Sequence, residues 1–175
     1  MTTPVTMSAA YFDAMYQAAA DPWGFEDRWY EQRKYAISMA LLPAARYRRA
    51  LEAGCSIGVL TRMLAARCDE VLSCDIAAAA VQAAARRTED LTHVRVEQRD
   101  IPGRWPDGRF DLIVFSEILY YLGNQDLEQA LSTRCPLSSR RAPCSPCTGG
   151  IRWPTTLGPV TTFTRCWQAA PGWHA

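Results

Sequence analysis

The chain has 175 residues, of which 49% are hydrophobic and 21% are charged, and its formal net charge is +1. This length and composition predict one soluble globular domain with a substantial core. A charge so close to neutral gives no reason to expect nucleic acid or a membrane surface as a partner. The sequence has no run of about 18 apolar residues and does not begin in the basic-then-apolar order of a signal peptide, so we expect a cytoplasmic protein.

Two helices are predicted near the start of the chain, over residues 8–20 and 28–42, because apolar residues recur there at helical spacing. The residues expected to share one stripe are Tyr11, Met15 and Ala18 in the first helix and Tyr30, Lys34, Ile37 and Leu41 in the second. The turn that separates the two helices has the sequence DPWG.

Two interpretations of this helix pair stay open. In the first, both helices pack on a sheet, and Trp23, Phe25 and Trp29 belong to the core. In the second, the pair is a lid over a ligand, and Arg33 or Lys34 meets a carboxylate. The second interpretation makes residues 1–45 a helical lid.

A short apolar strand ends in a glycine-punctuated turn at residues 50–58, whose sequence is ALEAGCSIG. Glycine at 54 and 58 allows a positive φ and lets a ligand come close to the backbone. The helical pattern over residues 59–66 then presents the unpaired N–H groups of its first turn. This order of strand, loop and helix predicts a cradle for a nucleotide-type ligand.

Three enzyme families place glycines in this way. The dinucleotide-binding loop G-x-G-x-x-G fits poorly, because Ser56 stands at its second glycine. The nucleophile elbow of α/β-hydrolases, G-x-S-x-G, matches Gly54 to Gly58 and would make Ser56 a nucleophile, with His174 as its histidine. Class I S-adenosylmethionine-dependent methyltransferases take an acid two residues before the first glycine, which Glu52 supplies. We favour the methyltransferase and keep the hydrolase as the alternative.

A second strand is predicted at residues 70–75 and ends in Asp75, 21 residues beyond Gly54. At this distance the tip of the strand can present a carboxylate to ribose hydroxyls. The alternative role of Asp75 is to cap the alanine-rich helix predicted over residues 77–88.

Two more strands are predicted at residues 93–98 and 110–115. Asp100 and Ile101 follow the first of them, where a methyltransferase would place its adenine site; a surface turn is the alternative. Strands that alternate with helices predict an α/β fold with a Rossmann-like, doubly wound, mostly parallel sheet. Right-handed crossovers then bring the carboxyl ends of all four strands to one edge.

The last 44 residues differ from the rest of the chain. All 18 acidic residues lie before residue 132, whereas residues 132–175 carry five arginines. In this segment apolar residues recur neither at helical spacing nor at the alternating spacing of a strand. When this segment is back-translated and read two bases on, acids, a P-G turn and an apolar strand return. We therefore expect a frameshift near residue 131, an irregular tail over 132–175, and a sheet truncated after its fourth strand. Cys144 and Cys147 have no second pair at zinc spacing, so no metal site is predicted.

Residues 11–131 contain the motifs DPWGFE, WYE, RKY, LEAGCSIGVLT, SCDIA and FDLIVFSEILYYL. Together they resemble the nodulation protein S family of S-adenosylmethionine-dependent N-methyltransferases, including an N-terminal part that other methyltransferases do not share. The resemblance implies S-adenosylmethionine as cofactor and residues 46–131 as its Rossmann-like binding domain. The implied contacts are Glu52, Gly54, Ser56 and Gly58 at the methionine end, Asp75 and Ile76 at the ribose, Asp100 and Ile101 at the adenine, and Ser116 and Ile118 at the sulfonium.

The predicted reaction is N-methylation of an amine on a small molecule or oligosaccharide, because the family methylates the free amine of a deacetylated chitooligosaccharide. An amine must lose its proton before it attacks, which makes Glu117 and Tyr120, just after the fourth strand, the candidate catalytic residues. A remnant that no longer functions stays a further alternative.

Overall fold

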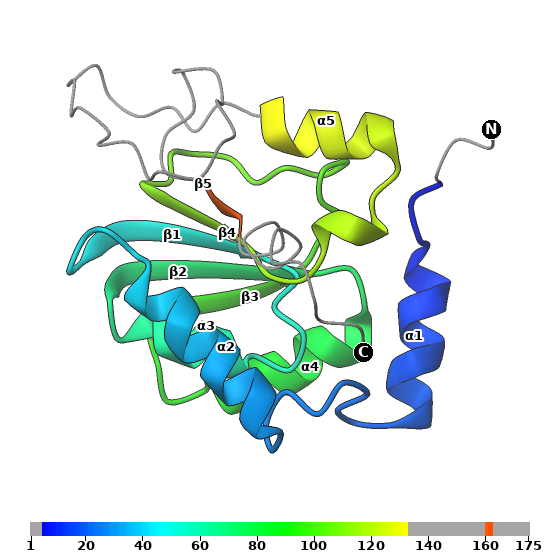
Figure 1. Cartoon of the computed structure of the whole chain (residues 1–175), viewed down its shortest axis with the longest axis horizontal. Coiled ribbons are helices and arrows are strands. Elements are labelled where there is room, and N and C mark those ends of the chain that lie inside the picture. Colours follow the sequence, from blue (N-terminus) through cyan, green and yellow to red (C-terminus); the bar gives the residue numbers. More distant parts are fainter. Residues whose placement is uncertain (1–4, 133–159, 163–175) are drawn as a thin grey trace, which may run out of the picture.

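The computed structural model describes residues 5–132 and 160–162, in which strands and helices alternate (Figure 1). The elements in chain order are α1 (Ala9–Ala18), α2 (Trp29–Ala40), β1 (Tyr47–Ala53), α3 (Val59–Ala65), β2 (Cys68–Asp75), α4 (Ala78–Arg87), β3 (Val94–Gln98), β4 (Leu112–Phe115), the 3₁₀-helix η1 (Leu119–Tyr121), α5 (Asn124–Ser132) and β5 (Val160–Thr162). The predicted α/β class with a doubly wound parallel sheet is confirmed.

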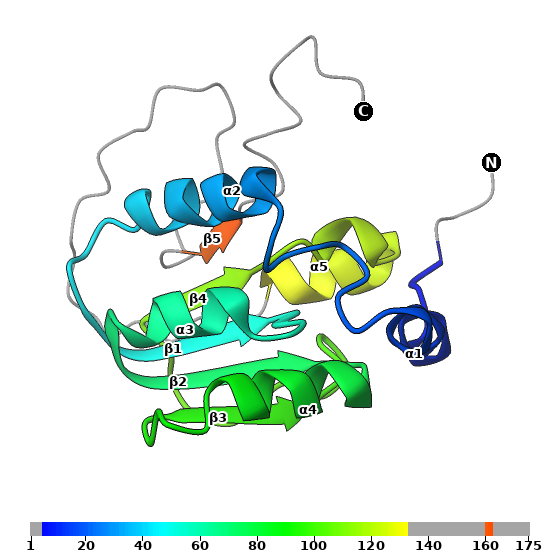
Figure 2. The ribbon, with the colours of Figure 1, turned by 90° about the horizontal axis from the view of Figure 1, so that it is seen from below.

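The sheet has the order β3-β2-β1-β4-β5, and all neighbouring strands are parallel. In its centre Leu51 of β1 pairs with Leu72 of β2 on one side and with Ile113 of β4 on the other. All carboxyl ends therefore point to one edge, and Figures 1 and 2 place α1 beyond that edge.

Each face of the sheet is covered by its own apolar cluster, because successive side chains of a strand point to opposite faces. On one face Ala50, Val71 and Leu112 pack with residues of α2, α3 and α4. On the other face are Leu51, Leu72 and Ile113, with Leu127 and Ala130 of α5. The central strands are buried on both faces, which explains their near-continuous apolar sequence.

The short strand β5 departs from the expectation that the sheet stops at its fourth strand. Val160 pairs with Ile113 in parallel register, so the sheet continues past β4. Three residues are too few to show a period, but Val-Thr-Thr suits a strand, and β4 offers an edge to pair with. The rest of the segment 132–175, including Cys144 and Cys147 and the expected frameshift, lies outside the described residues.

Helix α1 forms where it was predicted, but its buried face differs from the expected stripe. Tyr16 is the buried residue of α1, and Phe12, one turn earlier, is half-buried. Tyr11, which the stripe placed in the core, is 38% exposed. Two apolar stripes compete on this helix, and its packing against the loop after β1 selects the one with Tyr16.

Helix α2 also forms where it was predicted and turns a partly polar face inward. Its buried residues are Glu31, Lys34, Tyr35 and Ser38. Trp29 is 72% exposed, so its assignment to the core is wrong, whereas Phe25 is buried. An ion pair between Lys34 and Glu31 occupies the inward face. Trp29, the first residue of α2, lies on a different side of the helix.

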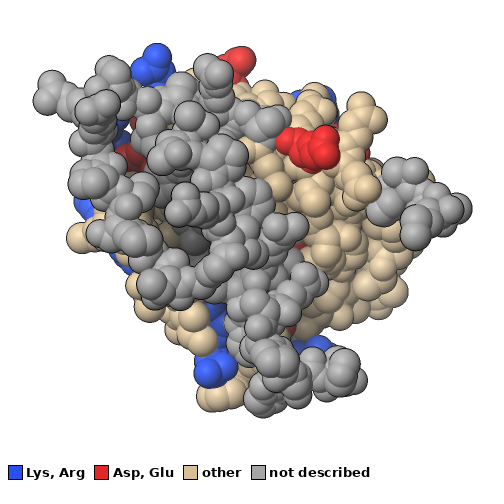
Figure 3. All heavy atoms as spheres, turned by 45° about the horizontal axis from the view of Figure 1, so that its top comes forward, with Lys and Arg blue, Asp and Glu red and all other residues tan. Residues whose placement is uncertain are grey.

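Among the described residues, no helix combines the length and the apolar content that a membrane crossing requires. On the face drawn in Figure 3, the Lys and Arg side chains of the described residues lie scattered at the margins and not in one patch.

Candidate functional site

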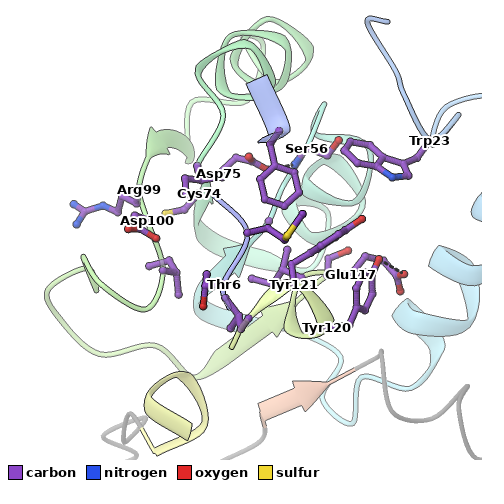
Figure 4. A pocket seen from close by; sticks show the side chains of 18 of the residues that line it. Thr6, Trp23, Ser56, Cys74, Asp75, Arg99, Asp100, Glu117, Tyr120 and Tyr121 are labelled. Carbon is purple, nitrogen blue, oxygen red and sulfur yellow. Dashed lines mark hydrogen bonds between the residues drawn. The ribbon is translucent and has the colours of Figure 1, made fainter. Parts of the chain in front are cut away.

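A cavity opens at the carboxyl edge of the sheet, under α1 (Figure 4). It contains about 770 Å³ of atom-free space, part of it open to solvent, within the range of about 300–1,000 Å³ found for small-molecule sites. Ten of the twelve predicted site residues line it: Gly54, Ser56, Asp75, Ile76, Asp100, Ile101, Ser116, Glu117, Ile118 and Tyr120. The topology thus brings together residues that are more than 60 positions apart in the chain.

The loop after β1 needs glycine at its first position. Gly54 has φ +80°, and a Cβ on it would collide with the Ile118 side chain and lie 3.1 Å from the Ser116 carbonyl oxygen. The Gly54 N–H donates to the carbonyl of Cys74 at the end of β2 (2.8 Å). This loop is therefore fixed to the sheet while its open side faces the cavity.

Ser56, two residues later, is held in a left-handed conformation with φ +49°. Such a conformation costs a non-glycine residue about 1–3 kcal/mol, so its surroundings must maintain it. Its N–H donates to Oδ2 of Asp75 (2.8 Å), and its hydroxyl lies 2.5 Å from the Tyr16 hydroxyl of α1. Burial raises the pKa of Tyr16 above its ordinary value, so the phenol keeps its proton near neutral pH.

Asp75 faces the cavity and also holds the backbone that leads into α4, whose N-cap is Ala77 and not Asp75. Its Oδ1 accepts the Ala77 N–H (3.0 Å) at the start of α4, while its Oδ2 holds the Ser56 loop. Burial raises the pKa of the Asp75 carboxyl, and the backbone N–H groups of Ala77 and Ser56 oppose that rise. Each carboxylate oxygen keeps a further lone pair with which to accept a ligand hydroxyl.

Glu52 and Gly58 are not among the residues that line the cavity, although the motif pointed to them. Glu52 is fully buried, and its Oε2 accepts the hydroxyls of Thr61 (2.6 Å) and Ser73 (2.8 Å). Burial raises the pKa of Glu52 to about 7. A Cβ on Gly58 would lie 2.9 Å from the Cα of Ala84, so this glycine allows α3 and α4 to approach closely. Both residues therefore stabilise the glycine loop without lining the cavity.

The two candidate catalytic residues meet on the β4 side of the cavity. The Tyr120 hydroxyl donates to Oε2 of Glu117 (3.1 Å), a contact that Figure 4 marks. Burial, and then the charge of Glu117, raises the pKa of Tyr120 above its ordinary value. Tyr120 is therefore a hydrogen-bond donor, and Glu117 is the proton acceptor of the pair.

Sequence reasoning missed the aromatic wall on the side of α1. Phe12 packs edge-on against Tyr121 with ring centroids 5.0 Å apart, and Trp23 stacks on Phe25 at 5.6 Å. These four rings and Tyr16 line the cavity. The signal was present in the spacing of four residues between Phe12 and Tyr16, which places both on one face of a helix.

The described structure does not support the hydrolase alternative, because no histidine within residues 5–132 lies beside Ser56. The nearest hydroxyl partner of Ser56 is Tyr16. His93 is the one histidine among residues 5–132, and its Nε2 lies 3.1 Å from the carbonyl oxygen of Ala65. His174 lies outside the described residues.

Comparisons with known proteins agree with this geometry. The family model of nodulation protein S (NodS) matches residues 14–136. Nodulation protein S of Rhizobium tropici is 35% identical over 111 residues, which are 61% of this chain and 45% of that protein. Nodulation protein S of Bradyrhizobium diazoefficiens is 34% identical over 106 residues, which are 60% of this chain and 51% of that protein.

Two solved structures share the fold. The N-methyltransferase NodS from Bradyrhizobium japonicum WM9, in complex with S-adenosyl-L-homocysteine, is 28% identical with a TM-score of 0.65, covering 71% of this chain and 65% of that chain. A candidate methyltransferase from Pseudomonas syringae is 48% identical with a TM-score of 0.55, covering 59% of this chain and 65% of that chain. The chain spans about half the length of the curated relatives it matches. The family model nevertheless covers more than half of the chain, which therefore belongs to the nodulation protein S family.

Proposed function

We propose that this chain is an S-adenosylmethionine-dependent methyltransferase that methylates an amine on a small molecule or oligosaccharide. The observation that carries the proposal is the single cavity onto which Gly54, Asp75, Asp100 and Glu117 open from four different strand ends. A relative with the same fold was solved with S-adenosyl-L-homocysteine, the product that remains after methyl transfer. The mainly aromatic and apolar wall with a few convergent polar groups suits a nucleoside ligand.

The residues present fit this cofactor. Gly54 and Ser56 line the cavity at the end of β1, where the methionine end would lie. Asp75 would accept hydrogen bonds from the ribose hydroxyls, Asp100 from the exocyclic amine of adenine, and Ile101 would cover an adenine face. When bound, S-adenosylmethionine supplies an electrophilic methyl group on its sulfonium.

The chain itself contributes alignment, exclusion of water and a proton acceptor. Helix α1 and the turn after it, within the proposed lid of residues 1–45, bring Phe12, Tyr16 and Trp23 over the cavity. Holding two reactants in register can supply about 7–11 kcal/mol of the barrier. Glu117 lies beside Tyr120 on the cavity wall, where it can take the proton of an ammonium before the amine reacts.

An oligosaccharide acceptor is favoured by the exposed rings near Glu117. Tyr120 is 49% exposed and Tyr30 is 47% exposed. The Lys34 ammonium is close to both Tyr30 and Glu117: it lies 5.8 Å from the Tyr30 ring centroid and 3.7 Å from Oε2 of Glu117. Exposed aromatic rings beside a polar group provide the apolar faces on which sugars stack.

Two measurements test the proposal. S-adenosylhomocysteine is titrated calorimetrically into protein whose folding has been checked by circular dichroism; a folded sample that gives no heat would favour a remnant that no longer binds cofactor. Transfer of a labelled methyl group is then followed with a chitooligosaccharide that carries one free amine. The fully acetylated oligosaccharide is the matched control, and equal labelling of both would contradict an amine acceptor.

A further inference from the structure

A buried cation lies directly behind the candidate proton acceptor. The Lys34 side chain is 10% exposed, and its ammonium is paired with Glu31, one turn earlier on α2. It also lies 3.7 Å from Oε2 of Glu117. The rings of Phe25, Tyr30 and Tyr35 have their centroids 5.5–5.8 Å from Nζ. Aromatic faces and carboxylates both stabilise a positive charge away from water.

Of the three charged residues in this cluster, Glu117 is the one that lines the cavity. Lys34 and Glu31 are not among the residues that line the cavity, whereas Glu117 is. Glu117 also has φ +60°, a left-handed conformation that is rare outside glycine and that the surrounding contacts must maintain. The Lys34 ammonium and the Tyr120 hydroxyl both contact Oε2 of Glu117 and so fix the direction in which the carboxylate points.

The charges in this cluster do not balance. Within the described part of the chain, two carboxylates, Glu31 and Glu117, share one ammonium, so one negative charge is left over. Among the described residues, the other titratable groups that face Glu117 are the phenols of Tyr35 on α2 and of Tyr120 and Tyr121 on η1. Burial raises the pKa of each phenol, so all three stay neutral near pH 7. The surplus charge is exposed to a ligand at Glu117, because Glu31 is buried.

We propose that Lys34 is a positioning residue, which keeps Glu117 directed into the cavity so that Glu117 receives the protonated amine of the acceptor. The incoming ammonium completes the charge balance of the cluster. It then gives its proton to Glu117: the N–H bond breaks, its electron pair remains on nitrogen, and an O–H bond forms on the carboxylate. This inference rests on the proposed methyltransferase function for its final step, but not for the coupling between Lys34 and Glu117.

The coupling is tested first without any substrate. Unfolding free energies are measured by urea titration for the wild type, Lys34→Met, Glu117→Gln and the double variant. Methionine keeps the length and the apolar stem of lysine and removes its charge. We expect the effects of the two changes to be clearly non-additive, because each variant removes one half of the same ion pair. Additive effects would overturn the proposal whether or not the protein is a methyltransferase.

The catalytic consequence is tested with a chitooligosaccharide that carries one free amine. In Lys34→Met we expect kcat/KM for this acceptor to fall at least tenfold, because Glu117 has lost the ammonium that fixes its direction. Affinity for S-adenosylhomocysteine should stay within twofold, since Lys34 does not line the cavity. Lys34→Arg keeps the charge and should restore part of the activity.

Arg33→Met is the matched control, because Arg33 is exposed on the same helix, and its guanidinium lies over Trp29 at 5.8 Å. It should leave the activity unchanged. Activity of Lys34→Met equal to that of the wild type, or no recovery of activity in Lys34→Arg, would overturn the proposal. Failure of the wild type to bind S-adenosylhomocysteine would instead refute the proposed function, and the unfolding cycle would still decide the coupling.

Discussion

The hydroxyl of Tyr16, on the N-terminal helix α1, lies 2.5 Å from the hydroxyl of Ser56, in the glycine loop after β1. This hydrogen bond joins the first helix of the chain to the strained backbone at the centre of the cavity. The N-terminal segment is also attached on the opposite side, where the Met7 N–H donates to the Tyr121 carbonyl (3.0 Å). Helix α1 is therefore held across the cavity at both of its ends.

Tyr16→Phe removes this hydrogen bond and keeps the ring. A hydrogen bond contributes about 0.5–1.5 kcal/mol, so we expect affinity for S-adenosylhomocysteine to fall about 2- to 12-fold in calorimetry. Tyr11→Phe is the control, because Tyr11 lies on the same helix but is exposed. A loss of the same size in both variants would mean that the Tyr16 hydroxyl has no particular role.

Asp75→Ala should weaken cofactor binding more than Glu117→Ala does, whereas Glu117→Ala should reduce turnover more. A charge-assisted hydrogen bond to ribose is worth about 1.5–3 kcal/mol, or roughly 10- to 150-fold in affinity. Because Asp75 also holds Ser56 and Ala77, Asp75→Asn separates the contributions by keeping one acceptor oxygen. Asp69→Ala, at the other end of β2, is the control, since Asp69 makes an exposed ion pair. Equal losses of affinity in Asp75→Ala and Glu117→Ala would contradict the assignment.

Glu52 should make stability depend on pH. Burial raises its pKa from 4.5 to about 7 in the folded chain. Between these two values the unfolded state has released a proton that the folded state still binds, so the free energy of unfolding falls as pH rises through this window. A shift of this size corresponds to about 3 kcal/mol.

Glu52→Gln removes this dependence. Relative to the wild type, its unfolding free energy should rise between about pH 5 and 7 and then level off, as measured by urea titration followed by tryptophan fluorescence. Glu70→Gln is the control, because Glu70 is largely exposed on the neighbouring strand. Parallel pH curves for Glu52→Gln and the wild type would show that folding does not raise the pKa of Glu52.

The order of the elements could be predicted from the sequence, because apolar runs of strand length alternate with helical spacing and their polar ends mark one edge. Which faces of the first two helices turn inward could not be predicted from the sequence. On α1 the stripes of Tyr11 and of Tyr16 are both apolar, and contact with Ser56 decides between them. On α2 the expected stripe contained Lys34, but its partner Glu31 on the inward face is a residue that hydrophobic periodicity assigns to solvent.

The candidate site, like the fold, could be predicted only in part. A motif records which residues a loop needs, but it does not say which of them face the ligand. Glu52 and Gly58 belong to the motif because one binds Thr61 and Ser73 beneath the loop and the other lets two helices approach closely. The aromatic wall depends on contacts between segments about 100 residues apart, such as Phe12 with Tyr121, which no local pattern reveals.

Gly54→Ala should abolish binding of S-adenosylhomocysteine. The new Cβ would collide with Ile118 and crowd the Ser116 carbonyl, and an L-residue at φ +80° adds about 1–2 kcal/mol of strain. Ile118→Ala in the same chain relieves the collision with the side chain but not the strain, so the double variant should regain only part of the affinity. Gly103→Ala is the matched control, because a Cβ there meets Asp100 at ordinary contact distances of 3.4–3.7 Å. If Gly54→Ala binds as tightly as Gly103→Ala, the loop moves freely, and the cradle inferred from its geometry does not hold the ligand.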